Sequence, residues 1–257
     1  MIHETATVHL EAHLGEQVVV EPFAVIGAGV VLGDRCHVGA HAVLQGPLSM
    51  GADNVIGPHA VLGTPPQDRA YRGEPTRLEI GDGNVIREFV TIHRATTKAD
   101  GVTRIGSHNM FMAYSHVGHD CLIGDHVTLA NCATLAGHVT VEDHVNIAGL
   151  CAIHQFARIG AFAMLGGGTM APMDIPPYAM ASGNHARLYG LNRRGLQRNG
   201  FSAEEIRQLR QAYRLLFNSG LRLEQALEAI ENDSALKSPR VAHLVTFIHG
   251  SKRGLTR

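Results

Sequence analysis

The sequence predicts a mainly β fold: a left-handed parallel β-helix of hexapeptide repeats, followed by a small C-terminal α-helical domain. Three observations support this prediction. Aliphatic residues return at every sixth position, glycine often follows them, and aromatic residues make up only 5% of the 257 residues, with no tryptophan. An α-helix would instead require returns at three and four residues. The period therefore indicates short strands that turn at glycine-containing corners, three to a coil.

The hexad begins near the start of the chain and has two interruptions. Its aliphatic positions are Val8, Leu14, Val20, Ile26, Leu32, Val38, Leu44, Met50, Ile56 and Leu62, then Ile80, Ile86 and Ile92, then Ile105, Phe111, Val117, Ile123, Leu129, Leu135, Val141, Ile147, Ile153, Ile159 and Leu165. Three hexads close a coil of about 18 residues, so residues 18 apart stack on neighbouring coils about 4.8 Å apart. We therefore expect the β-helix to occupy residues 1–186, with loops at 64–79 and 95–103 that serve binding.

Three of the four cysteines have a simple place in this frame. Cys36, Cys121 and Cys151 each lie two residues before an aliphatic repeat position, and side chains two apart in a strand point the same way. We interpret them as small residues that fill the narrow interior. None of the four cysteines forms a CxxC pair, so the sequence does not indicate a zinc knuckle or a redox motif.

The composition changes after about residue 186, where three amphipathic segments predict a helical domain over residues 187–257. In "FSAEEIRQLRQAYRLLF", Ser202 and Glu205 have the spacing of a capping box. "RLEQALEAIEN" predicts a second helix, and "SPRVAHLVTFIHG" predicts a third with Pro239 in its first turn. We expect these helices to cover the open strand edges at the end of the β-helix.

The formal net charge is −1, with no long run of one sign, so neither nucleic acid nor a membrane surface is expected as the main partner. No segment approaches the roughly 20 apolar residues of a transmembrane helix, which argues against stable membrane insertion. The start "MIHETATVHL" lacks the charged and apolar regions of a signal peptide. A cytoplasmic protein is therefore expected.

The stretch "AYSHVGHDCLIG", residues 113–124, carries the candidate chemistry. One coil of 18 residues brings Gly137 beside His119, and His138 beside Asp120. This arrangement suits acyl transfer, in which a neutral imidazole removes a proton from a hydroxyl and a backbone N–H receives the developing oxyanion. The aspartate would fix the tautomer of the imidazole and stabilise the imidazolium that forms.

Two other interpretations of this histidine-rich region compete with a catalytic one. A histidine in a strand can be purely structural, but several of them fall within a few coils, namely His116, His119, His138 and His154. Hexapeptide helices can also bind zinc between subunits through histidines. However, neither thiolate nor carboxylate ligands stand at a familiar zinc spacing, and an aspartate directly after His119 suits a base with its orienting partner better. No metal site is predicted.

Several longer segments follow one another in a known order: "GEPTRLEIGDGNVIREFVTIHRAT", "MAYSHVGHDCLIGDHV", "LAGHVTVEDHVNIAGL", "IHQFARIGAFAMLGG" and "DIPPYAMASGNHA". They resemble the acyl-carrier-protein–UDP-N-acetylglucosamine O-acyltransferase family, which opens lipid A (lipopolysaccharide) biosynthesis. The resemblance covers nearly the whole chain. It implies a cytoplasmic homotrimer that moves a 3-hydroxyacyl chain from acyl carrier protein to the 3-hydroxyl of UDP-N-acetylglucosamine. It implies no metal or tightly bound cofactor, because the acyl group arrives activated on a phosphopantetheine thioester.

The resemblance also implies roles for individual residues. His119 matches the general base, Asp120 its orienting partner, and Gly137 the oxyanion donor. Gly167 matches the position that sets acyl length, where glycine leaves room for a long chain. The other matching positions line the nucleotide-sugar and thioester cleft, which in this family lies between neighbouring subunits: Gln67, Asp68, His116, His138, His154, Gln155, Asn192 and Arg198.

Three positions depart from the family pattern. Ala70 stands where lysine is usual, Arg194 where glutamate is common, and Asn199 where arginine is common. All three touch the nucleotide end of the implied site and leave the base and the oxyanion donor unchanged. They therefore bear on affinity and on the choice of acceptor more than on the reaction.

Several alternatives stay open at the level of the sequence. The same reaction could use the 3-amino analogue of the sugar, or the chain could be a non-catalytic trimer that binds a nucleotide-sugar. A zinc-dependent hydratase on the same fold is a further alternative. A related N-acyltransferase that acts later in the pathway carries an extra N-terminal domain, whereas the hexad here begins by Val8, which argues against that enzyme.

Overall fold

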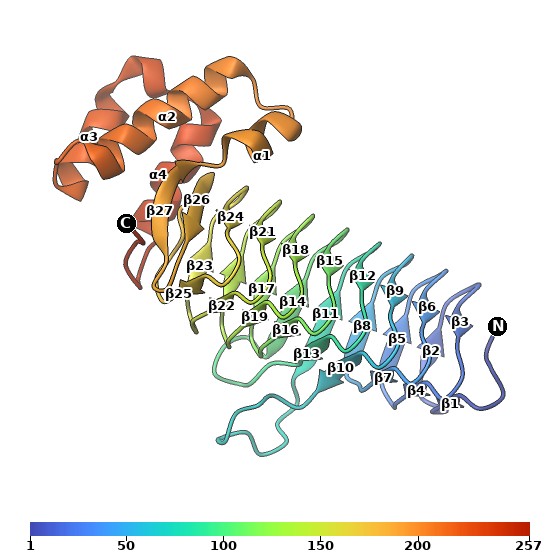
Figure 1. Cartoon of the computed structure of the whole chain (residues 1–257). Coiled ribbons are helices and arrows are strands. Elements are labelled where there is room, and N and C mark those ends of the chain that lie inside the picture. Colours follow the sequence, from blue (N-terminus) through green and yellow to red (C-terminus); the bar gives the residue numbers. More distant parts are fainter.

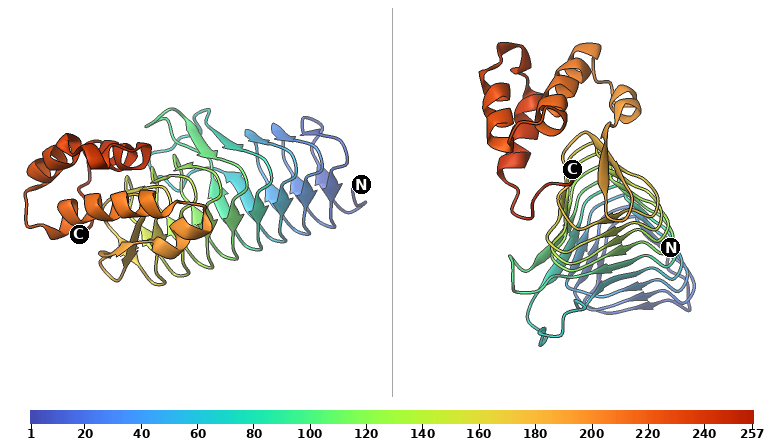
Figure 2. Two further views of the ribbon diagram at one scale, coloured as in Figure 1. Left: turned by 90° about the horizontal axis from the view of Figure 1, so that it is seen from above. Right: turned by 60° about the vertical axis from the view of Figure 1, so that its left-hand side comes forward.

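A computed structural model describes residues 1–257, which wind into a three-sided prism and end in a group of helices (Figure 1). Each coil contributes one short strand to each of three sheets. The triangular outline of the stacked coils is visible in the right-hand view of Figure 2. The predicted left-handed parallel β-helix is therefore confirmed.

The three sheets run along the faces of the prism. The first sheet contains β1 (Thr7–Val8), β4 (Val25–Ile26), β7 (Val43–Leu44), β10 (Val61–Thr64), β13 (Thr91–His93), β16 (His116–Val117), β19 (Thr134–Leu135), β22 (Ala152–Ile153) and β25 (Met170–Ala171). The second contains β2 (His13–Leu14), β5 (Val30–Leu32), β8 (Leu48–Met50), β11 (Arg77–Ile80), β14 (Val102–Ile105), β17 (Leu122–Ile123), β20 (Thr140–Val141) and β23 (Arg158–Ile159). The third contains β3 (Val19–Val20), β6 (His37–Val38), β9 (Val55–Ile56), β12 (Val85–Ile86), β15 (Met110–Phe111), β18 (Thr128–Leu129), β21 (Asn146–Ile147), β24 (Met164–Leu165), β26 (Ala179–Ser182) and β27 (Arg187–Leu191).

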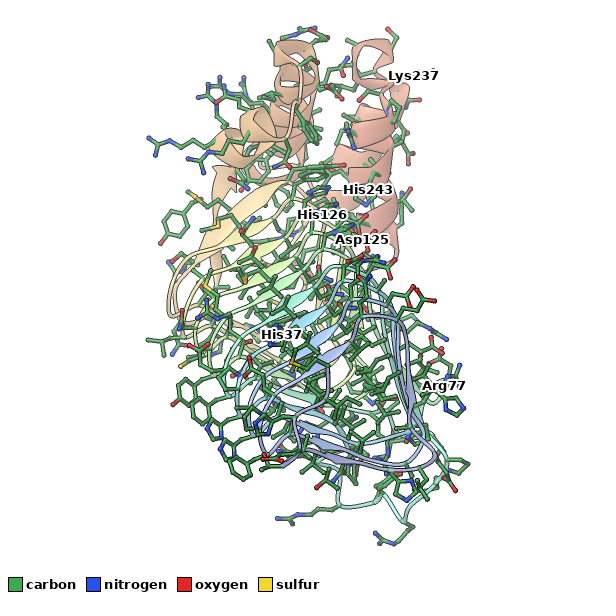
Figure 3. All side chains as sticks on the ribbon, turned by 90° about the vertical axis from the view of Figure 1, so that its right-hand side faces the viewer. His37, Arg77, Asp125, His126, Lys237 and His243 are labelled. Carbon is green, nitrogen blue, oxygen red and sulfur yellow. The ribbon has the colours of Figure 1, made fainter.

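The interior of the prism is one continuous cluster of 43 buried apolar residues. Repeat positions supply its larger side chains, and positions two residues earlier supply smaller ones. Cys36, Cys121 and Cys151 are buried there, as predicted, and all are free thiols. Side chains point into the triangular interior when the prism is viewed along its axis (Figure 3).

A ladder of three buried asparagines interrupts this apolar interior. Oδ1 of Asn54 accepts hydrogen bonds from the backbone N and from Nδ2 of Asn84, each at 2.9 Å. Oδ1 of Asn84 accepts one from the backbone N of Asn109 at 2.9 Å, and Oδ1 of Asn109 accepts one from the backbone N of Val127 at 2.6 Å. The ladder therefore joins four successive coils.

At one corner of the prism, five rings lie over one another with centroids 4.8–5.0 Å apart. This aromatic column consists of Phe23, His41, His59, Phe89 and Tyr114, and each residue has a φ near +60°. The positive φ turns the chain from the third sheet into the first. Tyr114 is 58% exposed and Phe23 is 55% exposed, so the column presents apolar surface on the outside of the single chain.

Two long loops leave the prism on the same side (Figure 1). The first spans residues 65–76 between β10 and β11, and the second spans residues 94–101 between β13 and β14. The Lys98 ammonium of the second loop contacts the Asp68 carboxylate of the first. The loops are therefore tied together within one chain.

The C-terminal helices are α1 (Arg193–Arg198), α2 (Ala203–Asn218), α3 (Leu223–Asn232) and α4 (Pro239–His249), with a 3₁₀ turn at Ser234–Leu236. The predicted capping box of Ser202 and Glu205 begins α2, and Pro239 lies in the first turn of α4. The short α1 was not predicted. The helices share a second core cluster that also contains Tyr178 of the prism. None of the helices combines the length and the apolarity that a membrane span requires.

The end of the β-helix is covered differently from the prediction. Strand β27 turns back and pairs antiparallel with β26, so a strand rather than a helix closes the third sheet. The second sheet ends on isolated bridges, one of them between Asp174 and Leu255 of the C-terminal tail. The expected division between residues 186 and 187 falls inside this hairpin. The reason for the difference is that an exposed strand edge is satisfied most directly by another strand.

Candidate active site

The His119–Asp120 pair lies at a corner of the prism directly after β16. Nδ1 of His119 is 2.7 Å from Oδ2 of Asp120. A proton on Nδ1 makes this hydrogen bond and leaves Nε2 with a free lone pair. The His119 side chain is 16% exposed, whereas the Asp120 side chain is fully buried. Such an imidazole can accept a proton from a substrate hydroxyl.

The Asp120 carboxylate is held by neighbours from other coils. The Thr96 N–H lies 3.1 Å from each carboxylate oxygen, and the Thr96 hydroxyl donates to Oδ2 at 2.7 Å. The backbone N–H of Asp120 donates to the Thr103 hydroxyl at 2.9 Å. Burial alone would raise the pKa of Asp120, but the hydrogen bonds from His119 and Thr96 outweigh it and hold that pKa below its ordinary value. Asp120 is therefore an anion at neutral pH.

Gly137 lies against the His119 ring, one coil further along the prism. A Cβ added to Gly137 would lie 2.6 Å from Cε1 and 2.7 Å from Nε2 of His119. No side chain fits there unless the imidazole moves. The Gly137 N–H has no hydrogen-bond partner within the chain, so it is available to an oxyanion. The 18-residue coil predicted this neighbour.

His138 completes the group. Its Nε2 lies 3.5 Å from Oδ2 of Asp120, and its ring stacks on Phe156 with centroids 4.5 Å apart. Burial lowers the pKa of His138, and the nearby His119 and Lys98 charges add to this effect against the attraction of Asp120. The aspartate–histidine neighbour predicted from the coil length is therefore present.

His119, Asp120 and His138 have ligand atoms within 4.8 Å of one another, close enough to hold a metal ion. The hydrogen-bond donors around Asp120 indicate that its carboxylate is a hydrogen-bond acceptor instead of a metal ligand. Its two oxygens already accept one N–H, one hydroxyl and one imidazole N–H. A metal on this carboxylate would have to displace those donors, so the surroundings fit a hydrogen-bonded anion better than a metal ligand.

His116 and His93 lie beside this group on the first sheet. Burial lowers the pKa of His116 to about 4, with smaller effects from His93 and His119, so it is neutral at pH 7. Its Nδ1 is 2.7 Å from the Thr91 hydroxyl. His93 was missed in the sequence. It is buried and bonds the Pro65 carbonyl at the start of the first loop at 2.7 Å. The signal for it was the histidine of "VTIHRAT", at the end of its strand beside the second loop.

The first loop brings Asp68 near the pair. The Lys98 hydrogen bond and the Ala70 N–H lower the pKa of Asp68, and the charges of Lys98 and His119 act in the same direction. Gln67 and Ala70 are exposed on the same loop. Lys98 was also missed, because the hexad repeat does not predict the position of a side chain in a loop.

His154 and Gln155 lie one coil beyond Gly137. Both are exposed, and the next residue, Phe156, donates its N–H to the Gly137 carbonyl at 3.2 Å. Gly167 lies at a different corner, where the chain turns from the third sheet into the first. It is exposed, and a Cβ there would lie 3.6 Å from its nearest neighbour, the carbonyl of Gly149. A side chain at 167 is therefore sterically possible.

The structure does not bring Asn192 and Arg198 to the His119 group within one chain. Asn192 caps α1: its Oδ1 accepts the Gly195 N–H at 3.1 Å, and its Nδ2 donates to the Phe162 carbonyl at 2.9 Å. Arg198 is exposed in the last turn of that helix. In Figure 1, α1 stands above the end of the prism, on the opposite side from the two loops.

Comparison with known families matches two parts of the chain. Residues 174–256 match the family described as UDP N-acetylglucosamine O-acyltransferase, domain 2. Residues 11–46 and 103–137 match the bacterial transferase hexapeptide family of six repeats. The segment 103–137 includes His119, Asp120 and Gly137 and ends one residue before His138.

Known relatives match along the whole chain. It is 49% identical over 256 residues to the acyl-[acyl-carrier-protein]–UDP-N-acetylglucosamine O-acyltransferase of Halorhodospira halophila, covering 100% of this chain and 99% of the relative. The enzyme of the same description from Herminiimonas arsenicoxydans is 46% identical, at the same coverage. Among solved structures, a UDP-N-acetylglucosamine acyltransferase from Bacteroides fragilis is 40% identical, with a TM-score of 0.97 and full coverage of both chains. A Francisella novicida enzyme is 36% identical, with a TM-score of 0.97 and 100% and 94% coverage.

Proposed function

Because the chain belongs to the family of acyl-[acyl-carrier-protein]–UDP-N-acetylglucosamine O-acyltransferases, we propose that His119 is the general base of its reaction. The chain is an acyltransferase that takes an acyl group from acyl carrier protein and transfers it to an oxygen of UDP-N-acetylglucosamine. One observation carries the assignment of the base. Nδ1 of His119 is 2.7 Å from the buried Asp120 carboxylate, beside a glycine that leaves room at the ring.

The proposed reaction is a direct acyl transfer. Nε2 of His119 removes the proton of the sugar hydroxyl as its oxygen attacks the thioester carbonyl. The Gly137 N–H donates to the oxyanion of the tetrahedral intermediate, and Asp120 stabilises the imidazolium. When the intermediate collapses, the C–S bond breaks and the imidazolium returns the proton to the departing thiolate. The product is the ester, and the carrier protein is left with a free thiol.

The details of both substrates belong to the proposal. We assign a 3-hydroxyacyl chain as the donor and the 3-hydroxyl of the sugar as the acceptor, in the first step of lipid A biosynthesis. Asp68 supports the acceptor position, because it is held near His119 by Lys98. We assign the rest of the cleft to Gln67, His116, His138, His154, Gln155, Asn192 and Arg198. Gly167 would set the acyl length, since it is exposed and its nearest neighbour is at ordinary contact distance from an added Cβ.

We further propose a homotrimer whose active sites lie between neighbouring prisms. Asn192 and Arg198 support it, because they lie away from the His119 group of their own chain and can serve that of another. The exposed aromatic column supplies apolar surface for such contacts. Light scattering is expected to give about three times the 27.6 kDa chain mass. We place the protein in the cytoplasm, where its free thiols are in their usual state.

Transfer from 3-hydroxyacyl carrier protein to UDP-N-acetylglucosamine tests the function, with wild type and His119→Ala side by side and a chelator present throughout. We expect wild-type transfer that is indifferent to the chelator, because the thioester is already activated and no metal or bound cofactor is required. The variant is expected to lose roughly 10²–10⁴-fold in kcat. Circular dichroism of both proteins controls for folding.

The acceptor decides between this function and its nearest alternative. If the wild type is inactive on the hydroxyl sugar but forms an amide with its 3-amino analogue, the O-acyl assignment is wrong. The assignment of His119 as the general base is unaffected by that result. If neither sugar is acylated at any donor chain length, a nucleotide-sugar-binding protein without turnover replaces the enzyme. Loss of transfer on adding chelator would instead point to the His119, Asp120 and His138 group as a metal site.

A further inference from the structure

We infer that Thr96 is a positioning residue for this reaction: its hydroxyl fixes the Asp120 carboxylate and thereby keeps the His119 imidazole in the tautomer with Nε2 free. The inference rests on the proposed role of His119. It extends the histidine–aspartate pair by a third member, which comes from the second loop, 24 residues away from Asp120 in sequence.

The three groups meet at a single oxygen. Oδ2 of Asp120 accepts the Thr96 hydroxyl at 2.7 Å and also lies 2.7 Å from Nδ1 of His119. The hydroxyl is itself oriented, because Thr96 Oγ1 accepts the backbone N–H of Lys98 at 3.2 Å. With that acceptor lone pair occupied, the hydroxyl proton is directed at the carboxylate. The donors are therefore fixed through the whole network: Lys98 N–H donates to the Thr96 hydroxyl, and the Thr96 hydroxyl and the His119 Nδ1–H both donate to Asp120.

Asp120 has a second histidine within reach, so the Thr96 hydroxyl can favour one of two possible carboxylate–histidine pairs. Nε2 of His138 lies 3.5 Å from the same Oδ2. A rotation of the carboxylate toward His138 would strengthen that contact at the cost of the bond to His119. The Thr96 hydroxyl opposes this rotation, because a fully satisfied buried polar network has one preferred arrangement. Thr96 thus selects which of two neighbouring histidines is paired.

The placement of Thr96 favours this role over simple packing. It is 3% exposed, yet it belongs to a loop and to neither a strand nor the apolar core cluster. Its backbone N–H bonds the carboxylate as well, at 3.1 Å to each oxygen. Replacing the hydroxyl alone therefore leaves the loop attached to Asp120, and the orienting contact can be removed without detaching the loop.

Thr96→Val is the test variant and Thr96→Ser the matched control. Valine has nearly the shape of threonine and cannot donate, whereas serine keeps the hydroxyl. We expect Thr96→Val to lose roughly tenfold in kcat, the effect of one hydrogen bond to a charged group, with KM within about twofold of wild type. Thr96→Ser is expected to match wild type. A purely structural role would leave kcat per folded molecule unchanged in both.

Nitrogen NMR of histidine-labelled protein provides a second measurement that does not need turnover. The His119 signal, assigned by its loss in His119→Ala among the 17 histidines, is expected to show the proton on Nδ1 in wild type and in Thr96→Ser. In Thr96→Val we expect a mixture of tautomers. Wild-type kcat together with a wild-type tautomer in Thr96→Val would overturn the inference.

Two further outcomes are separated by design. If Thr96→Val fails to fold, Thr96→Ala, which also lacks the hydroxyl but adds no bulk, answers the same question. If wild type itself shows no transfer, the proposed function fails, while the tautomer measurement still decides whether Thr96 orients the pair. Thr96→Val in an Asp120→Asn background is expected to cause no further loss, because the two residues act through one contact. An additive loss would place Thr96 outside the relay.

Discussion

At the scale of single residues, Gly137 has the tightest steric requirement in the site. Its backbone allows any L-residue, since its φ is not in the left-handed region, but an added Cβ would lie 2.6 Å from the His119 ring. A methyl group at this position is therefore accommodated by displacement of the His119 imidazole, and the protein can still fold. The expected effect is on catalysis and not on folding.

We predict that Gly137→Ala lowers kcat by about 10²-fold, the usual effect of displacing a catalytic group by about 1 Å. Steady-state transfer kinetics would measure it, with thermal unfolding as the check on folding. The double variant His119→Ala, Gly137→Ala serves as control. If alanine acts by displacing the ring, it causes no additional loss once the ring is absent. A further large loss in the double variant would show that the N–H donor itself has moved.

Residue positions on the repeat could be predicted from the sequence, and positions off the repeat could not. The coil length placed Gly137 beside His119 and His138 beside Asp120, because both pairs follow β-strands with a fixed 18-residue advance. Thr96 and Lys98 were missed, since they lie in a loop whose path depends on contacts that no period encodes. The hydrogen bonds from Thr96 that hold the Asp120 carboxylate could therefore not be predicted before the fold was known.

At the scale of elements, the asparagine ladder runs through the coils that the two loops interrupt. Asn84 follows Asn54 by 30 residues, and Asn109 follows Asn84 by 25, in place of the usual 18. Each long excursion leaves the prism on one side and must return in register. The buried amides bond coil to coil in the interior, so they fix that register across both interruptions.

We predict that Asn84→Ala destabilises the protein by about 2–3 kcal/mol, because it leaves the backbone N–H of Asn109 buried without an acceptor and removes the hydrogen bond from Nδ2 of Asn84 to Asn54. Urea unfolding would measure the change. Cys36→Ala is the matched control, because Cys36 lies in the interior one coil before Asn54 and its thiol donates to the Gly51 carbonyl, outside the ladder. Its expected cost is about 1 kcal/mol. Equal losses in the two variants would contradict a special role for the amides.

The helices show what local signals can and cannot specify. The helix that begins after Ser202 and the helix with Pro239 were predicted because their start signals are written in neighbouring residues. The strand β27 and the short α1 were not, because β27 exists only through its pairing with β26. An element defined by a distant partner leaves little trace in its own sequence.

At the scale of the whole molecule, buried neutral histidines make folded stability depend on pH. The pKa of His116 is lowered to about 4 by burial, and burial also lowers the pKa values of His138 and His144. An unfolded histidine binds a proton below about pH 6.5. Between these limits the unfolded chain binds more protons than the folded one, so stability is full above pH 6.5 and falls as the pH drops toward 4.

We predict that His116 alone contributes up to about 3 kcal/mol to this loss. His116→Gln is expected to flatten the pH dependence of unfolding between pH 6.5 and 4 by that amount, measured with urea at fixed protein concentration. His9→Gln, a change at an exposed histidine, is the matched control and is expected to leave the slope unchanged. An identical slope in wild type and His116→Gln would show that His116 does not stay neutral in the folded protein.

His144 belongs to a second column of stacked rings, which connects the prism to the C-terminal helices. His108, His126 and His144 stack at centroid distances of 5.2 and 4.7 Å, and the column continues through Phe162 to Tyr178. In Figure 3 the labelled His126 lies on the side of the prism nearest His243 of α4. His243 bonds the Tyr178 hydroxyl at 2.7 Å and so links this column to the helices.

The stacking of similar coils also determines how the length of this molecule can change. A coil touches only the coil before and the coil after it, and every inward side chain depends on keeping its place within an 18-residue turn. Insertion or deletion of one or a few residues in a strand therefore shifts the phase of every later position. Loss or gain of a whole turn shifts none. The body of the prism can therefore gain or lose only whole turns. Insertions of any other length are confined to its corners, where both loops are found.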